Sequence, residues 1–274
     1  MADVLVTPNS HVHRLLTRLA FENLVHPFQP FVFGQKNVGA SMAVRYNTPL
    51  VMYGENQAEY GNPLKETNNN QMDKSFFAVN DVNKVHLGGV AVPELIERYN
   101  LSLHDLKLYI PHPLEEIEET NVEVHYIGYY LPFDQQTNYY FACEHTKFQP
   151  NPERRDGTYS RYSSLDDKID DLHYYTTFVK FGLGKATLDA SQEIRAGHIT
   201  RDEGLALVKR YDGEFPKTHH EEVLDYLGIK EERFWEVIDN ARSPHLWQKQ
   251  NGEWKFLHGA WMDHHQNPNI RVAS

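Results

Sequence analysis

The chain alternates between short apolar runs and longer stretches in which apolar residues recur at helical spacing. Apolar runs at 3–7 and 49–53 predict two short buried strands. After Asn9, a residue that can cap a helix, apolar side chains fall every three or four positions as far as Leu24. This spacing predicts a helix with one buried face. Short strands that alternate with helices favour a parallel α/β sheet.

The rest of the first half continues this alternation with less regularity. Residues 27–39 are ambiguous, because two prolines and two glycines interrupt the apolar pattern. The other predictions are helices at 40–47, 92–100, 101–109 and 134–148, a strand at 122–133, and a long polar surface loop at 62–86.

The pattern becomes helical beyond the Pro-, Arg- and Ser-rich stretch 149–164. Thr200 and Glu203, and likewise Thr218 and Glu221, have the spacing of a capping box ahead of an apolar run. Gly213 and Gly228 stand where helices should end, and Asn251-Gly252 between two apolar arms predicts a hairpin. We therefore expect two parts, a Rossmann-like α/β domain at 1–150 and a mainly helical region with a terminal hairpin at 151–274.

Composition narrows the class of protein. The 274 residues carry a net charge of −11, which argues against binding nucleic acid through a basic surface. No apolar run is long enough to span a bilayer, no signal peptide is evident, and Cys143 is the only cysteine. We expect a cytoplasmic protein without disulfides or membrane insertion.

The first candidate site is the sequence "GENQAEYG" at 54–61, directly after the predicted strand 49–53. In open α/β sheets, ligands bind beyond the carboxyl ends of the strands. Glu55 and Glu59 share one face if a helix begins here, and with Asn56 they could hold Mg²⁺ on a nucleotide or steer an ammonia nucleophile. The alternative is a solvated loop whose carboxylates favour a helix start.

Two further segments carry candidate binding residues. Gln35, Lys36 and Asn37 lie between glycines and could contact a phosphate or a sugar, although such glycine-bounded loops are common. Arginines suit a diphosphate because each guanidinium donates paired hydrogen bonds. The candidates of this kind are Arg154, Arg155, Arg161 and, beyond them, Lys180. A linker with surface ion pairs explains the arginines equally well.

Metal and nucleophile chemistry find little support. The 16 histidines include the adjacent pairs at 219–220 and 264–265, but none has the helical spacing, with a nearby acid, that a zinc site needs. Cys143 lies among aromatic residues and is better explained as packing.

Several long blocks, in order, resemble the N-acetyl sugar amidotransferase family of the PP-loop ATP pyrophosphatase superfamily. They are "TPNSHVHRLLTRLAFENLVHPFQPFVFGQKN", "PLVMYGENQAEYG", "NPERRDGTYSRYSSLDDKIDDLHYYTTFVKFGLGKAT", "EIRAGHITRDEGLALVKRYDGEFP" and "FWEVIDNARSPHLW". The resemblance spans roughly residues 3–258.

The resemblance implies a role in bacterial surface polysaccharide synthesis, such as that of the lipopolysaccharide O-antigen. It implies that ATP with Mg²⁺ activates the acetamido group of a nucleotide-linked sugar, and that ammonia from a glutaminase subunit converts it to an acetamidino group. It also implies a doubly wound parallel sheet followed by a helical region. Glu55, Asn56 and Glu59 would then line the acceptor or nucleotide side of the cleft, with Gln35, Lys36 and Asn37 at its rim.

The chain departs from that family in one respect. Family members carry further N-terminal sequence with a glycine-rich "SGGKDS"-type loop for the ATP phosphates, whereas no Gly-Gly-Lys occurs here. We therefore expect a partial sheet without its first strands and its PP-loop. Three explanations remain open: a split enzyme completed by an N-terminal PP-loop polypeptide, a truncated gene product, or a non-catalytic module that binds a sugar nucleotide or a partner.

Overall fold

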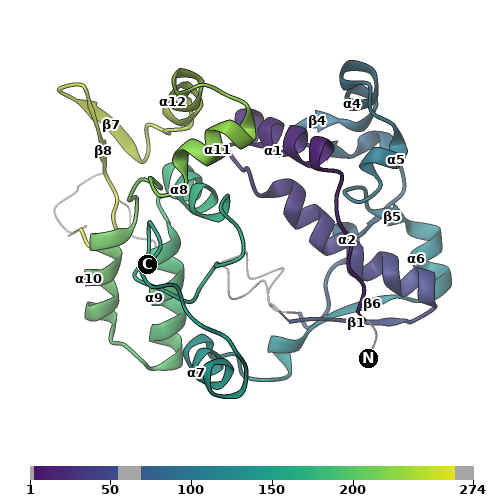
Figure 1. The fold of residues 1–274 in the computed structure, drawn as a ribbon, viewed down its shortest axis with the longest axis horizontal. Helices are drawn as coiled ribbons and strands as arrows, with labels where there is room; N and C mark the ends of the chain where they lie inside the picture. The colour runs from purple at the N-terminus through teal and green to yellow at the C-terminus, as the bar shows by residue number, and fades with distance from the viewer. Residues whose placement is uncertain (1–2, 55–68, 263–274) are drawn as a thin grey trace, which may run out of the picture. The chain divides into compact units, whose positions relative to one another are not determined.

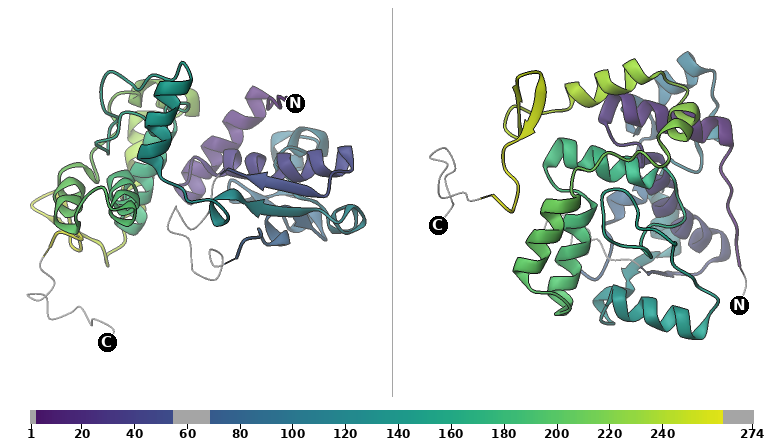
Figure 2. Two further views of the ribbon diagram at one scale, coloured as in Figure 1. Left: turned by 90° about the horizontal axis from the view of Figure 1, so that it is seen from below. Right: turned by 60° about the vertical axis from the view of Figure 1, so that its left-hand side comes forward.

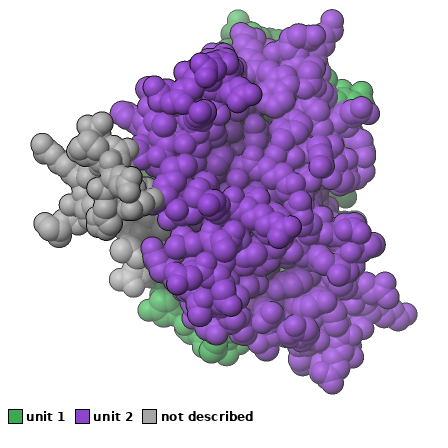
Figure 3. Space-filling view, turned by 90° about the vertical axis from the view of Figure 1, so that its left-hand side faces the viewer, with its two compact units in different colours: residues 1–133, 225–228 green, residues 134–224, 229–274 purple. Residues whose placement is uncertain are grey.

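The computed structural model describes residues 3–54 and 69–262 and separates into two compact units. Unit 1 contains Met1–Phe133 and Asp225–Gly228, and unit 2 contains Asp134–Leu224 and Ile229–Ser274; Figure 3 colours them separately. The domain boundary after residue 150 stays a prediction, since a compact unit is not by itself an independently folding domain. In the described ranges, no helix has the length and apolar character that a bilayer crossing needs.

Unit 1 mixes helices with very short strands. Its helices are α1 (Ser10–Leu24), α2 (Gln29–Tyr46), α4 (Val92–Tyr99), α5 (Leu103–Leu106) and α6 (Leu114–Thr120). Its strands are β1 (Leu50–Tyr53), β2 (Ala78–Val79), β3 (His86–Leu87), β4 (Val90–Ala91), β5 (His112–Pro113) and β6 (Glu123–Tyr126). Three 3₁₀ turns, η2 (Lys74–Phe76), η3 (Val82–Lys84) and η4 (Ile127–Tyr129), connect them. The predicted helix after Asn9 is confirmed, and the Asn9 side chain accepts from the backbone N–H groups that open α1.

The strands of unit 1 form separate two-stranded pairs. β1 and β6 are parallel, with Leu50 opposite Glu123 and Tyr53 opposite Tyr126, and they run side by side in Figure 1. β2 and β5 are also parallel, whereas β3 and β4 form an antiparallel pair. Leu50 is 52% exposed and Met52 44% exposed, so one face of β1 has no cover among the described residues. The predicted α/β class is confirmed at this level: a mixed unit with small parallel pairs, followed by a helical part.

The predicted strand at 3–7 is wrong. Residues 3–9 form no regular structure, and Leu5 is 91% exposed. An apolar run becomes a strand only where another strand pairs with it and a core covers one face. Local composition could not show that residues 3–7 lack such a partner.

Helix α2 runs through the segment that the sequence left ambiguous. Pro30 lies in the first turn, where its missing N–H does not interrupt the helix. Gly39 allows a close approach to β1, since a Cβ added there would lie only 3.0 Å from Val51 Cγ1. The expected glycine-bounded loop at 34–39 is therefore helical, because packing against the strand overrides the low helix propensity of glycine.

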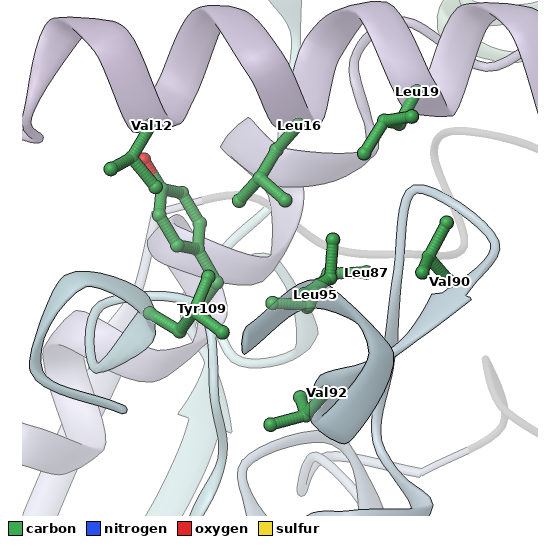
Figure 4. Packing of buried hydrophobic residues seen from close by; sticks show 9 residues of the cluster. Val12, Leu16, Leu19, Leu87, Val90, Val92, Leu95 and Tyr109 are labelled. Carbon is green, nitrogen blue, oxygen red and sulfur yellow. The ribbon is translucent and has the colours of Figure 1, made fainter. Parts of the chain in front are cut away.

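The main core of unit 1 lies under α1. Figure 4 shows Val12, Leu16 and Leu19 pointing from one face of α1 toward Leu87 and Leu95. The three positions follow the spacing that predicted a buried face, and all three are nearly inaccessible to solvent. A second core cluster joins α2 with β6 and α6.

Unit 2 is mainly helical, as predicted. Its helices are α7 (Gln135–His145), α8 (Asp170–Phe181), α9 (Lys185–Ala196), α10 (Arg201–Tyr211), α11 (His220–Leu227), whose last residues belong to unit 1, and α12 (Glu231–Asn240). Both views of Figure 2 show α9 and α10 side by side. The capping box of Thr200 and Glu203 is present at the start of α10. The predicted hairpin is β7 (Trp247–Gln250) with β8 (Glu253–Phe256), joined at Asn251-Gly252 with positive φ at both residues.

Candidate functional site

A pocket of about 450 Å³ opens within unit 2, among α7, α9, α10 and the irregular segment 146–169. Its lining residues are Gln136, Tyr139, Pro150, Tyr159, Ser160, Arg161, Tyr162, Glu193 and Leu207. The lining combines aromatic rings with hydroxyl, amide, carboxylate and guanidinium groups. Small-molecule sites typically have this composition, an apolar wall with a few polar groups.

Two stacked tyrosines form the aromatic wall. The rings of Tyr139, on α7, and Tyr162, on the irregular segment, are 4.1 Å apart at their centroids and lie within 8° of parallel. Arg161 is an electrostatic neighbour of the Tyr139 hydroxyl, whereas Glu193 is a neighbour of the Tyr162 hydroxyl. Both charged side chains therefore lie close to the tyrosine pair.

Glu193 lies beside the phenol of Tyr159, whose hydroxyl oxygen is buried. The Tyr159 hydroxyl has no hydrogen-bond partner within the described part of the chain, although it lies near enough to Glu193 to feel its charge. Burial is the main cause that raises the pKa of Tyr159, and the charges of Glu193 and Asp189 add to it. Burial also raises the pKa of the Glu193 carboxyl group. An unpartnered buried hydroxyl beside such a carboxyl is typical of a binding or catalytic position.

Arg161 is the cationic residue of the pocket lining. Its Nε donates to the backbone oxygen of Asn151 at 2.9 Å, and the Asn151 N–H donates back to the backbone oxygen of Arg161 at 2.8 Å. Within residues 3–54 and 69–262, its two terminal nitrogens make no hydrogen bond. The residue is exposed, so these nitrogens can donate to an anion.

Buried ion pairs hold the irregular segment in place. The Arg155 Nε lies 2.8 Å from Asp171 Oδ1 on α8, and both side chains are over nine-tenths buried. A second guanidinium nitrogen of Arg155 donates to the backbone oxygen of Asp167 at 2.9 Å. These bonds fix both ends of the stretch 155–167, which has no regular secondary structure and carries Tyr159, Ser160, Arg161 and Tyr162 of the pocket lining.

A second buried pair lies next to the pocket on α9. The Lys185 Nζ is 2.6 Å from Asp189 Oδ1, and the Thr158 hydroxyl donates to Asp189 Oδ2 at 2.5 Å. Thr158 directly precedes Tyr159, so Asp189 connects the base of α9 to the segment that lines the pocket.

Asp170 is a third buried carboxyl of this network. Burial raises its pKa from 3.8 to about 6, opposed by a hydrogen bond from Ser164 and by the charges of Lys185 and Arg155. The group is therefore partly protonated near neutral pH, unlike an ordinary aspartate.

The structure places the sequence-based candidates in different surroundings. Arg161 lines the pocket, whereas Arg154 forms a paired interaction with Glu214, at 2.6 and 2.8 Å, and Arg155 is buried against Asp171. Lys180 lies in the last turn of α8, where burial lowers its pKa. The structure thus brings one of these four cations to the pocket.

The candidates in unit 1 lie on helix α2. The backbone oxygens of Gln35 and Lys36 accept from the Tyr53 hydroxyl, at 2.5 and 3.0 Å, and the Lys36 ammonium lies 3.8 Å from the centroid of the Phe76 ring. Asn37 is only 2% exposed, and its side-chain oxygen has no hydrogen-bond partner among the residues that the structure describes. These contacts give the helix a packing role against β1.

Glu55, Asn56 and Glu59 lie outside the described residues. In the part that is described, no group of three or more His, Cys, Asp or Glu side chains comes together as a metal site.

Sequence reasoning missed eight of the nine lining residues, among them Tyr139, Tyr159, Tyr162 and Glu193. We considered the stretch "TYSRYSS" for its arginine and not for the tyrosines that flank it. Glu193 stands four residues after Asp189 on one helix, a spacing that places both carboxylates on the same face. The tyrosine–arginine alternation before this helix was the signal that could have revealed the site.

The match with a known family falls on this part of the chain. Residues 156–260 match the family model described as LPS biosynthesis protein WbpG-like, C-terminal domain. The matched region includes Tyr159, Ser160, Arg161, Tyr162, Glu193 and Leu207 of the pocket lining. No curated protein matches the chain. The WbpG-like match supports the expected relation to lipopolysaccharide biosynthesis, at the level of this C-terminal region.

Proposed function

We propose that this protein acts in lipopolysaccharide biosynthesis as part of an N-acetyl sugar amidotransferase, and that the pocket of unit 2 binds the nucleotide-linked acceptor sugar. The reaction would convert the acetamido group of the sugar to an acetamidino group, with ammonia from a glutaminase partner. The observation that carries the proposal is the overlap between the WbpG-like region and the pocket lining. The sequence resemblance described above supplies the reaction.

The chemistry of the pocket supports an acceptor role. The terminal nitrogens of Arg161, which make no hydrogen bond among the described residues, suit a phosphate. The tyrosine pair suits a flat ring or the apolar face of a sugar, and the carboxyl and hydroxyl groups suit sugar hydroxyls. Arg161 and Glu193 line the same pocket, so one ligand could contact both.

ATP would supply the activation of the amide oxygen. Among the described residues, Arg154 and Arg155 are engaged in ion pairs, and no group of three or more His, Cys, Asp or Glu side chains comes together. We assign no step of ATP chemistry to these residues. Glu55, Asn56 and Glu59 remain our proposal for the nucleotide or ammonia side, with the doubly wound PP-loop fold as the frame that would present them.

The test is turnover with defined components. The purified chain is incubated with a UDP-linked N-acetylated sugar, ATP, Mg²⁺ and ammonium, with and without a polypeptide that carries a PP-loop. Mass spectrometry then detects the exchange of oxygen for nitrogen in the sugar, and AMP is measured alongside. Conversion under either condition supports the proposal, whereas no conversion under both overturns the amidotransferase part.

A second candidate function is a non-catalytic module that binds the sugar nucleotide. The lining of the pocket favours it, because Arg161, the tyrosine rings and Glu193 suit a sugar phosphate without any ATP chemistry. Binding of the UDP-sugar by this chain, without any conversion in the assay above, would support the module over the enzyme.

A further inference from the structure

We propose that Glu193 and Tyr159 determine specificity in the pocket by binding the hydroxyl groups of a glycosyl phosphate, while Arg161 holds its phosphate. This inference rests on the proposed function for the choice of a sugar, and it adds the orientation of the ligand and the residues that recognise each end.

The buried hydroxyl of Tyr159 is the first evidence that a ligand binds here. A buried hydroxyl that lacks a hydrogen bond is costly, so such groups in folded proteins generally have a partner. Glu193 lies close enough to the Tyr159 hydroxyl to interact with it, yet no hydrogen bond of ordinary length and angle reaches this hydroxyl within the described residues. A ligand hydroxyl between them would accept from Tyr159 and donate to Glu193, which satisfies both groups at once.

The charges of Glu193 and Arg161 determine which end of the ligand lies beside each residue. A phosphate next to Glu193 would meet a carboxylate of the same sign in a half-buried setting, where repulsion is weakly screened. Arg161 lines the same pocket and is exposed, and its terminal nitrogens make no hydrogen bond among the described residues. The phosphate therefore belongs with Arg161 and the uncharged, hydroxyl-rich ring with Glu193.

The stacked tyrosines determine which kind of group can bind between the phosphate and the hydroxyl groups of the ligand. The stacked rings of Tyr139 and Tyr162 offer an apolar surface with no charge of its own. A sugar ring has an apolar C–H face and polar hydroxyl edges, so it can cover this surface while its edge reaches Glu193. Inorganic phosphate would meet Arg161 alone.

The experiment compares three probes by calorimetry on the full chain at pH 8: N-acetylglucosamine 1-phosphate, UDP-N-acetylglucosamine and UDP. Glu193→Gln keeps the size of the side chain but removes its charge, and should weaken the two sugar-bearing probes about tenfold or more. UDP, which lacks the hexose, should change less than twofold. Tyr159→Phe should act in the same direction, and Arg161→Met should weaken all three probes.

Glu253→Gln on the exposed hairpin strand β8 is the matched control for loss of one carboxylate, and it should change none of the three affinities. Circular dichroism and the unfolding midpoint confirm that each variant is folded. Equal weakening of all probes by Glu193→Gln, or no binding of any probe to the unmodified chain, would overturn the inference. The inference would also be overturned if Arg161→Met weakened binding while the probes with and without the sugar ring bound the unmodified chain equally well.

The outcome separates this inference from the proposed function. Binding that depends on Glu193, without any amidine product, keeps the inference and removes the enzyme. Amidine formation with an unchanged KM in Glu193→Gln keeps the enzyme and removes the inference.

Discussion

The hydroxyl of Thr158 donates a 2.5 Å hydrogen bond to Asp189, 31 residues away in the sequence. The same carboxylate receives Lys185 at 2.6 Å, so one aspartate joins an irregular segment to the first turn of a helix. Both members of the ion pair are over nine-tenths buried. A buried charge needs its partner far more than an exposed charge does, because water cannot replace it.

We therefore predict that Asp189→Asn lowers the free energy of unfolding by about 3–5 kcal/mol, since it leaves the Lys185 ammonium buried without a counter-charge. Urea denaturation followed by fluorescence measures the change. The double variant Lys185→Met with Asp189→Leu should recover much of this loss. A single variant as stable as the original would show that Asp189 does not hold the segment.

The matched control is an exposed ion pair in the same unit. Lys168 and Glu222 lie 2.5 Å apart, but both side chains are 59% exposed. Lys168→Met should change the free energy of unfolding by no more than about 1 kcal/mol. A similar loss in both variants would mean that burial is not the cause.

The second prediction concerns the pH dependence of stability. The pKa of Asp170 is about 6 in the folded chain and 3.8 ordinarily, so the folded state keeps a proton between these values that the unfolded state has lost. Stability should therefore fall as pH rises from about 4 to 6, by up to about 3 kcal/mol from this group alone. Asp170→Asn should remove this part of the slope.

The measurement is the difference between the two proteins, because other carboxyl groups titrate in the same range. The pKa of Glu214 is lowered by its bond with Arg154, for example, and its contribution is lost in acid in both proteins. Denaturation curves at pH 4, 5, 6 and 7 give the difference. If Asp170→Asn shows the same slope as the original chain, the group titrates normally.

The third prediction separates the two neighbouring arginines by role. Arg154→Lys removes the paired geometry with Glu214, which one ammonium cannot reproduce, and should lower the free energy of unfolding by about 1 kcal/mol. It should leave the affinity for N-acetylglucosamine 1-phosphate within twofold of that of the unmodified chain, because the Arg154 guanidinium is already paired with Glu214. A large loss of affinity without loss of stability would show that Arg154 belongs to the binding site.

The elements that could be predicted are those that neighbouring residues determine. The Thr200–Glu203 capping box and the Asn251-Gly252 turn each depend on a few consecutive residues, and each has the expected geometry. The helix after Asn9 depends on apolar spacing alone. Such features follow from sequence because no distant partner decides them.

The features that could not be predicted depend on distant partners. Residues 3–7 have the composition of a strand but pair with no strand among the described residues, and Gly39 in α2 allows β1 to pack closely against the helix. The pocket depends on Tyr139 stacking with Tyr162, from segments that apolar periodicity cannot bring together. Of the candidate cations, Arg161 lines the pocket. Arg154 and Arg155 form ion pairs with carboxylates that only the fold places beside them.

The last prediction concerns Gly213, which follows α10. Its φ is +79°, and a Cβ there would overlap the Phe178 ring on α8. Gly213→Ala therefore combines backbone strain with a steric clash, and we expect it to lower the free energy of unfolding by about 2–4 kcal/mol. Gly197 has a φ of +80° with nothing within 4 Å of the added Cβ, so Gly197→Ala should cost only the backbone part, about 1 kcal/mol. Thermal and urea unfolding of both variants measure the difference, and equal losses would show that Phe178 does not pack against this turn.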